Sequence, residues 1–112
     1  MALIDRQWFF LRCLAKLIDF AEAQGYTLSG GELYRPQEMQ DIYYARKLTR
    51  TKHSKHTDRL AIDVHVFLDG KYQTGKEGYD KLGAYWTSLD PTCIWGGNFR
   101  TLKDYNHFEV MI

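Results

Sequence analysis

The chain has 112 residues, of which 45% are hydrophobic and 15% are aromatic. This length and composition predict a single packed domain over residues 1–112 and exclude an intrinsically disordered chain. The formal net charge of +1 gives no overall reason to expect nucleic acid or a membrane as a partner.

The sequence carries no recognisable targeting or membrane segment. No apolar run approaches the length of a membrane span, and acidic Asp5 stands where a signal peptide would have its basic region. We therefore expect a chain that is made in a cytoplasm without a signal peptide and has no integral membrane contact. We also expect it to be a monomer. Cys13 and Cys93 are too few and too far apart in the sequence for a disulfide framework, so they are interpreted as reduced core thiols.

The first predicted element is a helix from about residue 5 to residue 24, which Gly25 ends. Its apolar residues recur at three- and four-residue spacing and predict one buried stripe. The expected stripe consists of Trp8, Leu11, Leu14, Ala15, Ile18 and Ala21.

An extended segment is predicted over residues 26–35, followed by a second helix that begins at Pro36 and runs to about residue 47. Arg35 therefore lies at a strand-to-helix junction, where its side chain can point into a cleft. The alternative is a surface arginine that pairs with Glu32 or Glu38. Gln40 is the one polar residue near the inner side of this helix.

A dense basic run follows the second helix. Such a run is either a solvated loop or a rim that attracts an anionic polymer. Its members are Arg46, Lys47, Arg50, Lys52, Lys55 and Arg59.

Residues 60–67 are rich in β-branched and aromatic residues and predict a buried strand, which Asp69-Gly70 turns into a second strand near residues 71–73. Asp63 lies in the middle of the first strand, where a carboxylate is costly unless it is paired or bound to a metal ion. His65 shares its face. We expect His65 to lie beside the metal ligands without binding the metal.

A third helix is predicted over residues 76–89, and a last strand begins near His107. Between them, Trp95-Gly96-Gly97 would let the backbone approach a ligand or another strand closely. The predicted fold is α+β, with a small antiparallel sheet that carries the metal ligands and packs against about three helices.

Two parts of the sequence could each provide half of a metal site. His56 stands seven residues before Asp63, and near the C-terminus Asp104 stands three residues before His107. Two imidazoles and one carboxylate around an open fourth position are the ligand set of a hydrolytic zinc centre. The sequence therefore predicts a zinc hydrolase.

Four motifs follow one another in the chain: Ser54-x-His56, Ala61-x-Asp63, Trp95-Gly96-Gly97 and Asp104-x-x-His107-Phe108-Glu109. Together they resemble the zinc D-alanyl-D-alanine carboxypeptidase family, which includes L-alanyl-D-glutamate endopeptidases that bacteriophages use as endolysins. The resemblance covers residues 35–109 and is strongest to the short phage and prophage branch. Two departures are Arg59, where the wider family favours glycine, and His65, where this branch often has asparagine.

The resemblance implies that His56, Asp63 and His107 bind Zn²⁺ and that Asp104 is the general base. It also implies that Arg35 stabilises the developing oxyanion or holds a substrate carboxylate. Supporting roles are implied for further residues: Ser54 in orienting the peptide, Glu109 in fixing a histidine, and Trp95 in the surroundings of the site.

The implied substrate is the peptide stem of peptidoglycan, cut on the periplasmic side of the inner membrane. We favour the L-alanyl-D-glutamate amide, because an endolysin must sever crosslinked stems. The alternative within the family is the terminal D-alanyl-D-alanine bond.

Two other classes remain open. A metal-dependent nuclease could combine His56, Asn106 and His107 with the basic run, although the ligand set fits amide hydrolysis better. A non-catalytic wall-binding relic is the second alternative. In that case His56, Asp63, Asp104 and His107 would all be present without taking part in catalysis.

Overall fold

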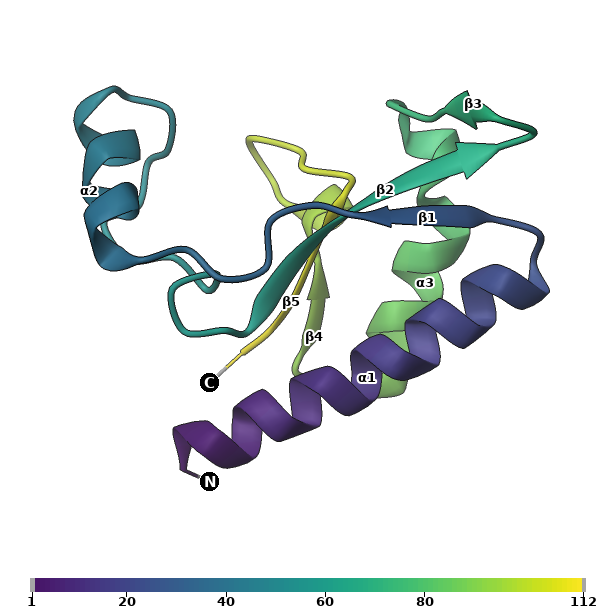
Figure 1. Cartoon of the computed structure of the whole chain (residues 1–112), viewed down its shortest axis with the longest axis horizontal. Helices are drawn as coiled ribbons and strands as arrows, with labels where there is room; N and C mark the ends of the chain where they lie inside the picture. The colour runs from purple at the N-terminus through teal and green to yellow at the C-terminus, as the bar shows by residue number, and fades with distance from the viewer. Residues whose placement is uncertain (1, 112) are drawn as a thin grey trace.

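The structure is a computed structural model that describes residues 2–111. It has a long first helix, two shorter helices and a small sheet (Figure 1). The elements in chain order are α1 (Leu3–Ala23), β1 (Thr27–Gly30), α2 (Gln37–Ala45), β2 (Ala61–Leu68), β3 (Lys71–Tyr72), the 3₁₀ turn η1 (Lys76–Gly78), α3 (Asp80–Leu89), β4 (Cys93–Trp95), the 3₁₀ turn η2 (Gly96–Asn98) and β5 (His107–Val110).

The sheet is antiparallel throughout and has the strand order β1-β2-β5-β4, with β3 also paired to β2. The long strand β2 is its centre, and its first half pairs with β5 while its second half pairs with β1 and β3. The pairing of β2 with β5 places Asp63 directly opposite His107. The predicted α+β fold class is confirmed.

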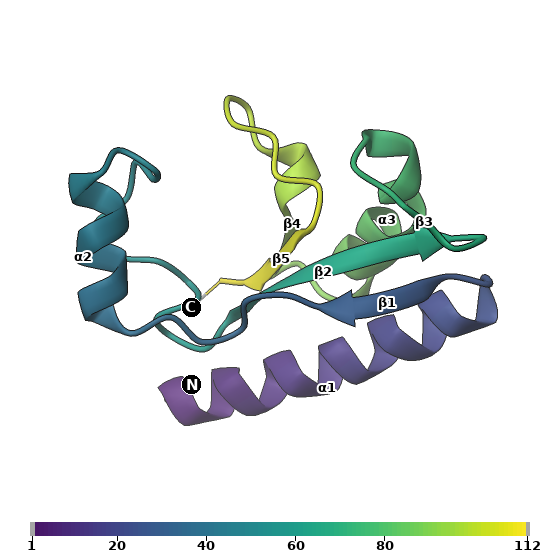
Figure 2. The ribbon, with the colours of Figure 1, turned by 45° about the horizontal axis from the view of Figure 1, so that its top comes forward.

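The two faces of β2 differ in what they meet. Ile62, Val64 and Val66 belong to the buried core that also includes residues of α1 and α3. Asp63 and His65 point to the opposite face, because successive side chains of a strand alternate. Figure 2 shows α1 running along one side of the sheet, while α2 stands away from it at the end opposite β3.

The buried stripe of α1 agrees only in part with the predicted one, of which Ala21 is fully buried and Leu14 packs against the core. Trp8 is 63% exposed, and Leu11 and Ile18 are also exposed. The core face consists of Phe10, Cys13, Leu17 and Ala21. Both stripes have helical spacing, so periodicity cannot choose between them. The edge-to-face contact of Phe10 with Trp86 of α3, with ring centroids 5.8 Å apart, belongs to the face that packs.

The remaining elements follow the predicted order with shifted bounds. The strand β4 was not predicted, because three residues are too few for a periodic signal. Cys13 and Cys93 are buried and free, and the fold brings their sulfur atoms to 3.9 Å from one another despite their separation in the sequence. Between residues 2 and 111, no helix has the length and apolar character needed to cross a membrane.

Candidate metal centre and cleft

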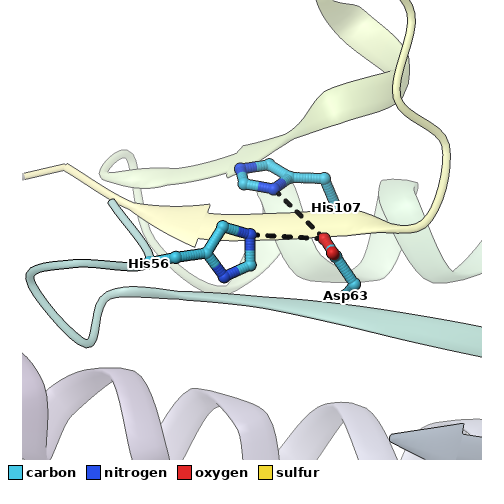
Figure 3. Close-up of side chains that lie close together, drawn as sticks. All are labelled: His56, Asp63 and His107. Carbon is cyan, nitrogen blue, oxygen red and sulfur yellow. Dashed lines mark ion pairs between the residues drawn. The ribbon is translucent and has the colours of Figure 1, made fainter. Parts of the chain in front are cut away.

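Three side chains converge on the open face of the sheet, as Figure 3 shows. His56 comes from the loop before β2, Asp63 from β2 and His107 from the start of β5. Asp63 Oδ1 lies 3.4 Å from His56 Nε2 and 3.5 Å from His107 Nδ1. Residues 51 positions apart in the sequence thus form one cluster.

The loop that carries His56 is fixed by its own backbone. Ser54 Oγ accepts a hydrogen bond from the His56 amide at 3.1 Å, and the Arg35 amide donates to the His56 carbonyl at 3.2 Å. The loop ends at Arg59, which has a φ of 61°. This left-handed conformation explains why glycine suits the position, and the Arg59 guanidinium stacks on the Tyr34 ring at 3.9 Å.

Both histidines are oriented by the ring nitrogen that faces away from Asp63. His56 Nδ1 lies 3.1 Å from the Leu33 carbonyl, and His107 Nε2 lies 2.8 Å from Glu109 Oε1. Each acceptor requires a proton on the nitrogen that it contacts. In a neutral ring, the other nitrogen then has its lone pair directed at Asp63, which is how metal-binding histidines are held.

The cluster fits a metal ion. Asp63 Oδ1 is buried and has no hydrogen-bond partner among the described residues. In a tetrahedral site with bonds of about 2.1 Å, neighbouring ligand atoms lie about 3.4 Å apart. The distances of 3.4 and 3.5 Å match this spacing. The donor set of two nitrogens and one oxygen is that of a zinc site with an open fourth position.

The electrostatics of the cluster favour a cation. Burial opposes ionisation of Asp63, but its contacts with His107 and His56 outweigh burial and hold the pKa of this carboxyl well below its usual range. For His107, burial acts to lower the pKa, yet Asp63 and Glu109 raise it to about 9. The carboxylates therefore stabilise a positive charge at this place. A bound metal ion would take the place of the proton on His107.

Asp104 stands at the edge of the cluster. Its Oδ2 lies 4.0 Å from His107 Nδ1, and half of its side chain is exposed. Burial raises its pKa above the usual value, and the charge of Asp63 acts in the same direction. A carboxyl that is close to the ligands, reachable from solvent and shifted toward neutrality is suited to proton transfer.

The glycine pair explains how Asp104 is placed. The Asp104 amide donates to the Gly96 carbonyl at 3.0 Å, and a Cβ on Gly96 would lie 2.1 Å from the Asp104 carbonyl oxygen. Trp95 donates from Nε1 to the Tyr105 carbonyl at 2.7 Å. Trp95 is itself buried in the core and does not line the cleft. It therefore supports the loop that carries Asp104.

Arg35 lines the cleft and is held on several sides. Its guanidinium pairs with Glu32 through Nε and Nη2, and Nη1 donates to Gln40 Oε1 at 2.7 Å and to Ser54 Oγ at 3.5 Å. Tyr43 lies under it at 4.8 Å. The sequence left open whether Arg35 points into a cleft or pairs with an acidic neighbour. In the structure it does both, because it pairs with Glu32 and lines the cleft.

Gln40 is a residue of the site whose role the sequence did not reveal. It is fully buried, and its Nε2 donates to the Thr51 carbonyl at 2.7 Å. Its amide thereby links Arg35 to the loop that follows α2. The sequence showed only a polar residue near the inner side of a helix, and this pattern does not reveal which groups the residue bonds to.

The cleft itself has a volume of about 530 Å³. One wall is formed by the metal cluster with Asp104. The other is formed by Arg35 together with His53 and Lys55 of the loop after α2.

His65 lies on the same face of β2 as Asp63 but outside the group of metal ligands. Its Nδ1 lies 3.2 Å from the Tyr72 hydroxyl, in a hollow further along β2. Among the described residues, the group that could hold a metal ion consists of His56, Asp63 and His107.

Comparison with known proteins places these residues in a family. Residues 48–110 match the family model described as D-alanyl-D-alanine carboxypeptidase, and this match covers more than half of the chain. The chain belongs to this family. The matched region contains His56, Asp63, Asp104 and His107, while Arg35 precedes it. The family predicted from the sequence motifs is confirmed.

The fold also has a solved relative. The chain is similar to the L-Ala-D-Glu endopeptidase ChiX of Serratia marcescens, with a TM-score of 0.72 and 23% identity over 88% of this chain and 77% of that one. This likeness supports the fold. No curated protein sequence matches the chain.

Proposed function

We propose that the chain is a zinc-dependent peptidase that hydrolyses the L-alanyl-D-glutamate amide in the peptide stem of peptidoglycan. The observation that carries the proposal is the convergence of His56, Asp63 and His107, with ligand atoms within 4.8 Å of one another, beside Asp104 in an open cleft. Membership of the D-alanyl-D-alanine carboxypeptidase family supports peptidase chemistry.

The metal would be held by His56 Nε2, Asp63 Oδ1 and His107 Nδ1. A zinc ion at such a site lowers the pKa of a water molecule to about 7 and polarises a carbonyl group. The protein keeps both imidazoles in place through the Leu33 carbonyl and Glu109. This second layer of hydrogen bonds prevents the rings from turning away when the cleft is empty.

Asp104 is the proposed general base. Its carboxylate takes a proton from the attacking water and returns it to the amine that leaves. The Gly96 contact holds its backbone, so the carboxylate stays within reach of the ligand cluster.

Arg35 is the proposed anion-binding group. Its contacts with Glu32, Gln40 and Ser54 fix the orientation of the guanidinium before substrate binds. A fixed cation in the cleft stabilises negative charge without reorganisation during the reaction. It can act on the oxyanion or on a carboxylate of the stem.

The choice of bond rests on two considerations. The solved relative is named an L-Ala-D-Glu endopeptidase. The sequence motifs also resemble those of the short phage branch, whose lytic role requires a cut that detaches crosslinked stems from the glycan. The proposed site of action is therefore the cell wall, on the periplasmic side, in a lytic role of the phage endolysin kind. Hydrolysis of the terminal D-alanyl-D-alanine bond is the second candidate, favoured by the description of the family.

Mass spectrometry of purified sacculi digested with the zinc-loaded protein tests the proposal. We expect released fragments that begin with D-glutamate, and L-alanine that stays on muramic acid. Release of free D-alanine alone would assign the chain to the carboxypeptidases. Intact sacculi after treatment with protein that contains its metal would contradict both.

A further inference from the structure

The open face of the sheet continues past the metal cluster into a second hollow. This hollow has a volume of about 280 Å³ and is lined by Ser29, His65, Phe67 and Tyr72. We name these four residues the aromatic platform. None of its four members is an acid, a lysine or an arginine, in contrast to the cleft around Arg35.

Strand pairing assembles the aromatic platform. Ser29 of β1 pairs with His65, and Tyr72 of β3 pairs with Phe67, so all four side chains share one face. The Tyr72 ring lies 5.7 Å from the His65 ring and 5.4 Å from the Phe67 ring, centroid to centroid. Tyr72 is 50% exposed, so a large part of its surface remains available for contact.

The surface between the metal cluster and the aromatic platform is kept clear by Gly31. A Cβ at this position would lie 2.8 Å from His65 Nε2 and 3.0 Å from Asp63 Cβ. Any larger residue would therefore stand between the two. On the other side, Tyr72 also lines a hollow of about 220 Å³ that Asp104 borders. The aromatic platform is thus continuous with the proposed catalytic residues.

We propose that the aromatic platform binds an N-acetylated amino sugar of the glycan strand to which the stem is attached. This inference rests on the proposed function. A lining without acids, lysine or arginine suits an uncharged sugar, whose C–H face packs on exposed aromatic rings. The Ser29 hydroxyl, the Tyr72 hydroxyl and His65 Nε2 supply hydrogen-bonding groups for the hydroxyl and acetamido substituents.

The spacing along β2 agrees with the proposed bond. His65 and Phe67 are two and four positions from Asp63, or about 7 and 13 Å along a strand. In the substrate, one alanine and the lactyl ether separate the L-alanyl-D-glutamate amide from the muramic acid ring, a reach of about 7 Å. The terminal D-alanyl-D-alanine bond lies about 20 Å from the same ring in an extended stem. With an extended stem, the first bond places the sugar beside the aromatic platform while the amide is at the metal cluster, whereas the terminal bond would require the stem to fold back.

The test compares two substrates that contain the same scissile amide, one a disaccharide-linked stem peptide and the other the free peptide without sugar. We expect the wild-type protein to show a higher kcat/KM on the disaccharide-linked substrate. In Tyr72→Ala the ratio of the two kcat/KM values should fall about tenfold, while Tyr72→Phe, which keeps the ring, should retain most of it. Trp8→Ala removes an exposed aromatic side chain on α1, away from the cleft, and should leave the ratio unchanged. An unchanged ratio in a folded, zinc-containing Tyr72→Ala protein would overturn the proposal.

A binding measurement on the wild-type protein separates this proposal from the proposed function. The peptide-free disaccharide of N-acetylglucosamine and N-acetylmuramic acid is added to the zinc-loaded protein and followed by NMR. We expect shifts at His65 and Tyr72. If the protein cuts neither substrate but these shifts occur, the proposed function fails and the sugar site stands. If it cuts the peptide and millimolar disaccharide shifts neither residue, the sugar site fails alone.

Discussion

The two walls of the cleft are held in place by different means. The wall with the metal cluster is built on β2 and β5, whose backbone pairing sets Asp63 opposite His107 above the hydrophobic core. The wall with Arg35 consists of the segment that leads into α2 and of the loop after α2, and the end of this loop also carries His56. The one buried residue of α2 is the polar Gln40. Figure 2 shows α2 standing clear of the sheet. Strand pairing holds Asp63 and His107 in place, whereas the wall with Arg35 and the loop of His56 depend on a few hydrogen bonds.

This comparison predicts that substitutions in the wall with the metal cluster abolish hydrolysis, while substitutions in the wall with Arg35 weaken substrate binding. The largest effect is expected for Asp104→Asn. It should keep the fold and the metal but lower hydrolysis by about a hundredfold or more, because the amide cannot take up the proton. Steady-state assays with matched zinc analysis measure this. Asp19→Asn, at an exposed position of α1, is the control and should have wild-type activity. If Asp104→Asn loses its metal and excess zinc restores activity, Asp104 is a ligand.

The second-largest expected effect comes from removing the contact between Glu109 and His107 Nε2. Glu109→Ala removes the acceptor 2.8 Å from His107 Nε2. The ring then loses its orientation, and zinc affinity should fall about 10- to 100-fold. Competition with a chromogenic chelator measures the change. Glu22→Ala, on the exposed side of α1, should leave affinity unchanged. Equal affinity in Glu109→Ala and the wild type would show that the ring needs no such support.

On the second wall, Gln40→Ala should have a smaller effect on activity. It removes the hydrogen bond that Gln40 accepts from Arg35 Nη1 and leaves the Thr51 carbonyl without its side-chain donor, at a cost of about 1–3 kcal/mol in folding free energy. We expect zinc content to stay at the wild-type level, kcat/KM to fall about tenfold, and amide hydrogen exchange to accelerate in α2 but not in β2. Glu38→Gln changes an exposed residue of the same helix, whose side chain makes no hydrogen bond within the described residues, and is the matched control. Exchange that accelerates equally in α2 and β2 would contradict the division into two walls.

The sequence predicted the wall with the metal cluster better than the wall with Arg35. The order and spacing of His56, Asp63, Asp104 and His107 pointed to the cluster, because a strand that buries a carboxylate requires a partner. Neither the contact between Gln40 and Arg35 nor the contact between His65 and Tyr72 could be predicted. Both depend on which side chains meet after the chain has folded, and local spacing carries no information on this.

The core shows the same limit. Helical spacing predicted α1 over nearly its full length but favoured Trp8 and Ile18, which are exposed, over Phe10 and Leu17, which are fully buried. A helix with two apolar stripes satisfies the pattern in two ways. The choice is made by tertiary contacts such as that of Phe10 with Trp86.

The most direct measurement is the zinc content of the chain and of its ligand variants, purified without added metal and analysed by elemental mass spectrometry. We expect about one zinc per chain for the wild type and for Asp104→Asn. His56→Ala, Asp63→Ala and His107→Ala should each have lost it, because two remaining donors hold the ion too weakly to survive purification. A His56→Ala protein that keeps a full equivalent of zinc, or wild-type protein that is stripped of metal and remains fully active in chelator, would contradict the metal centre.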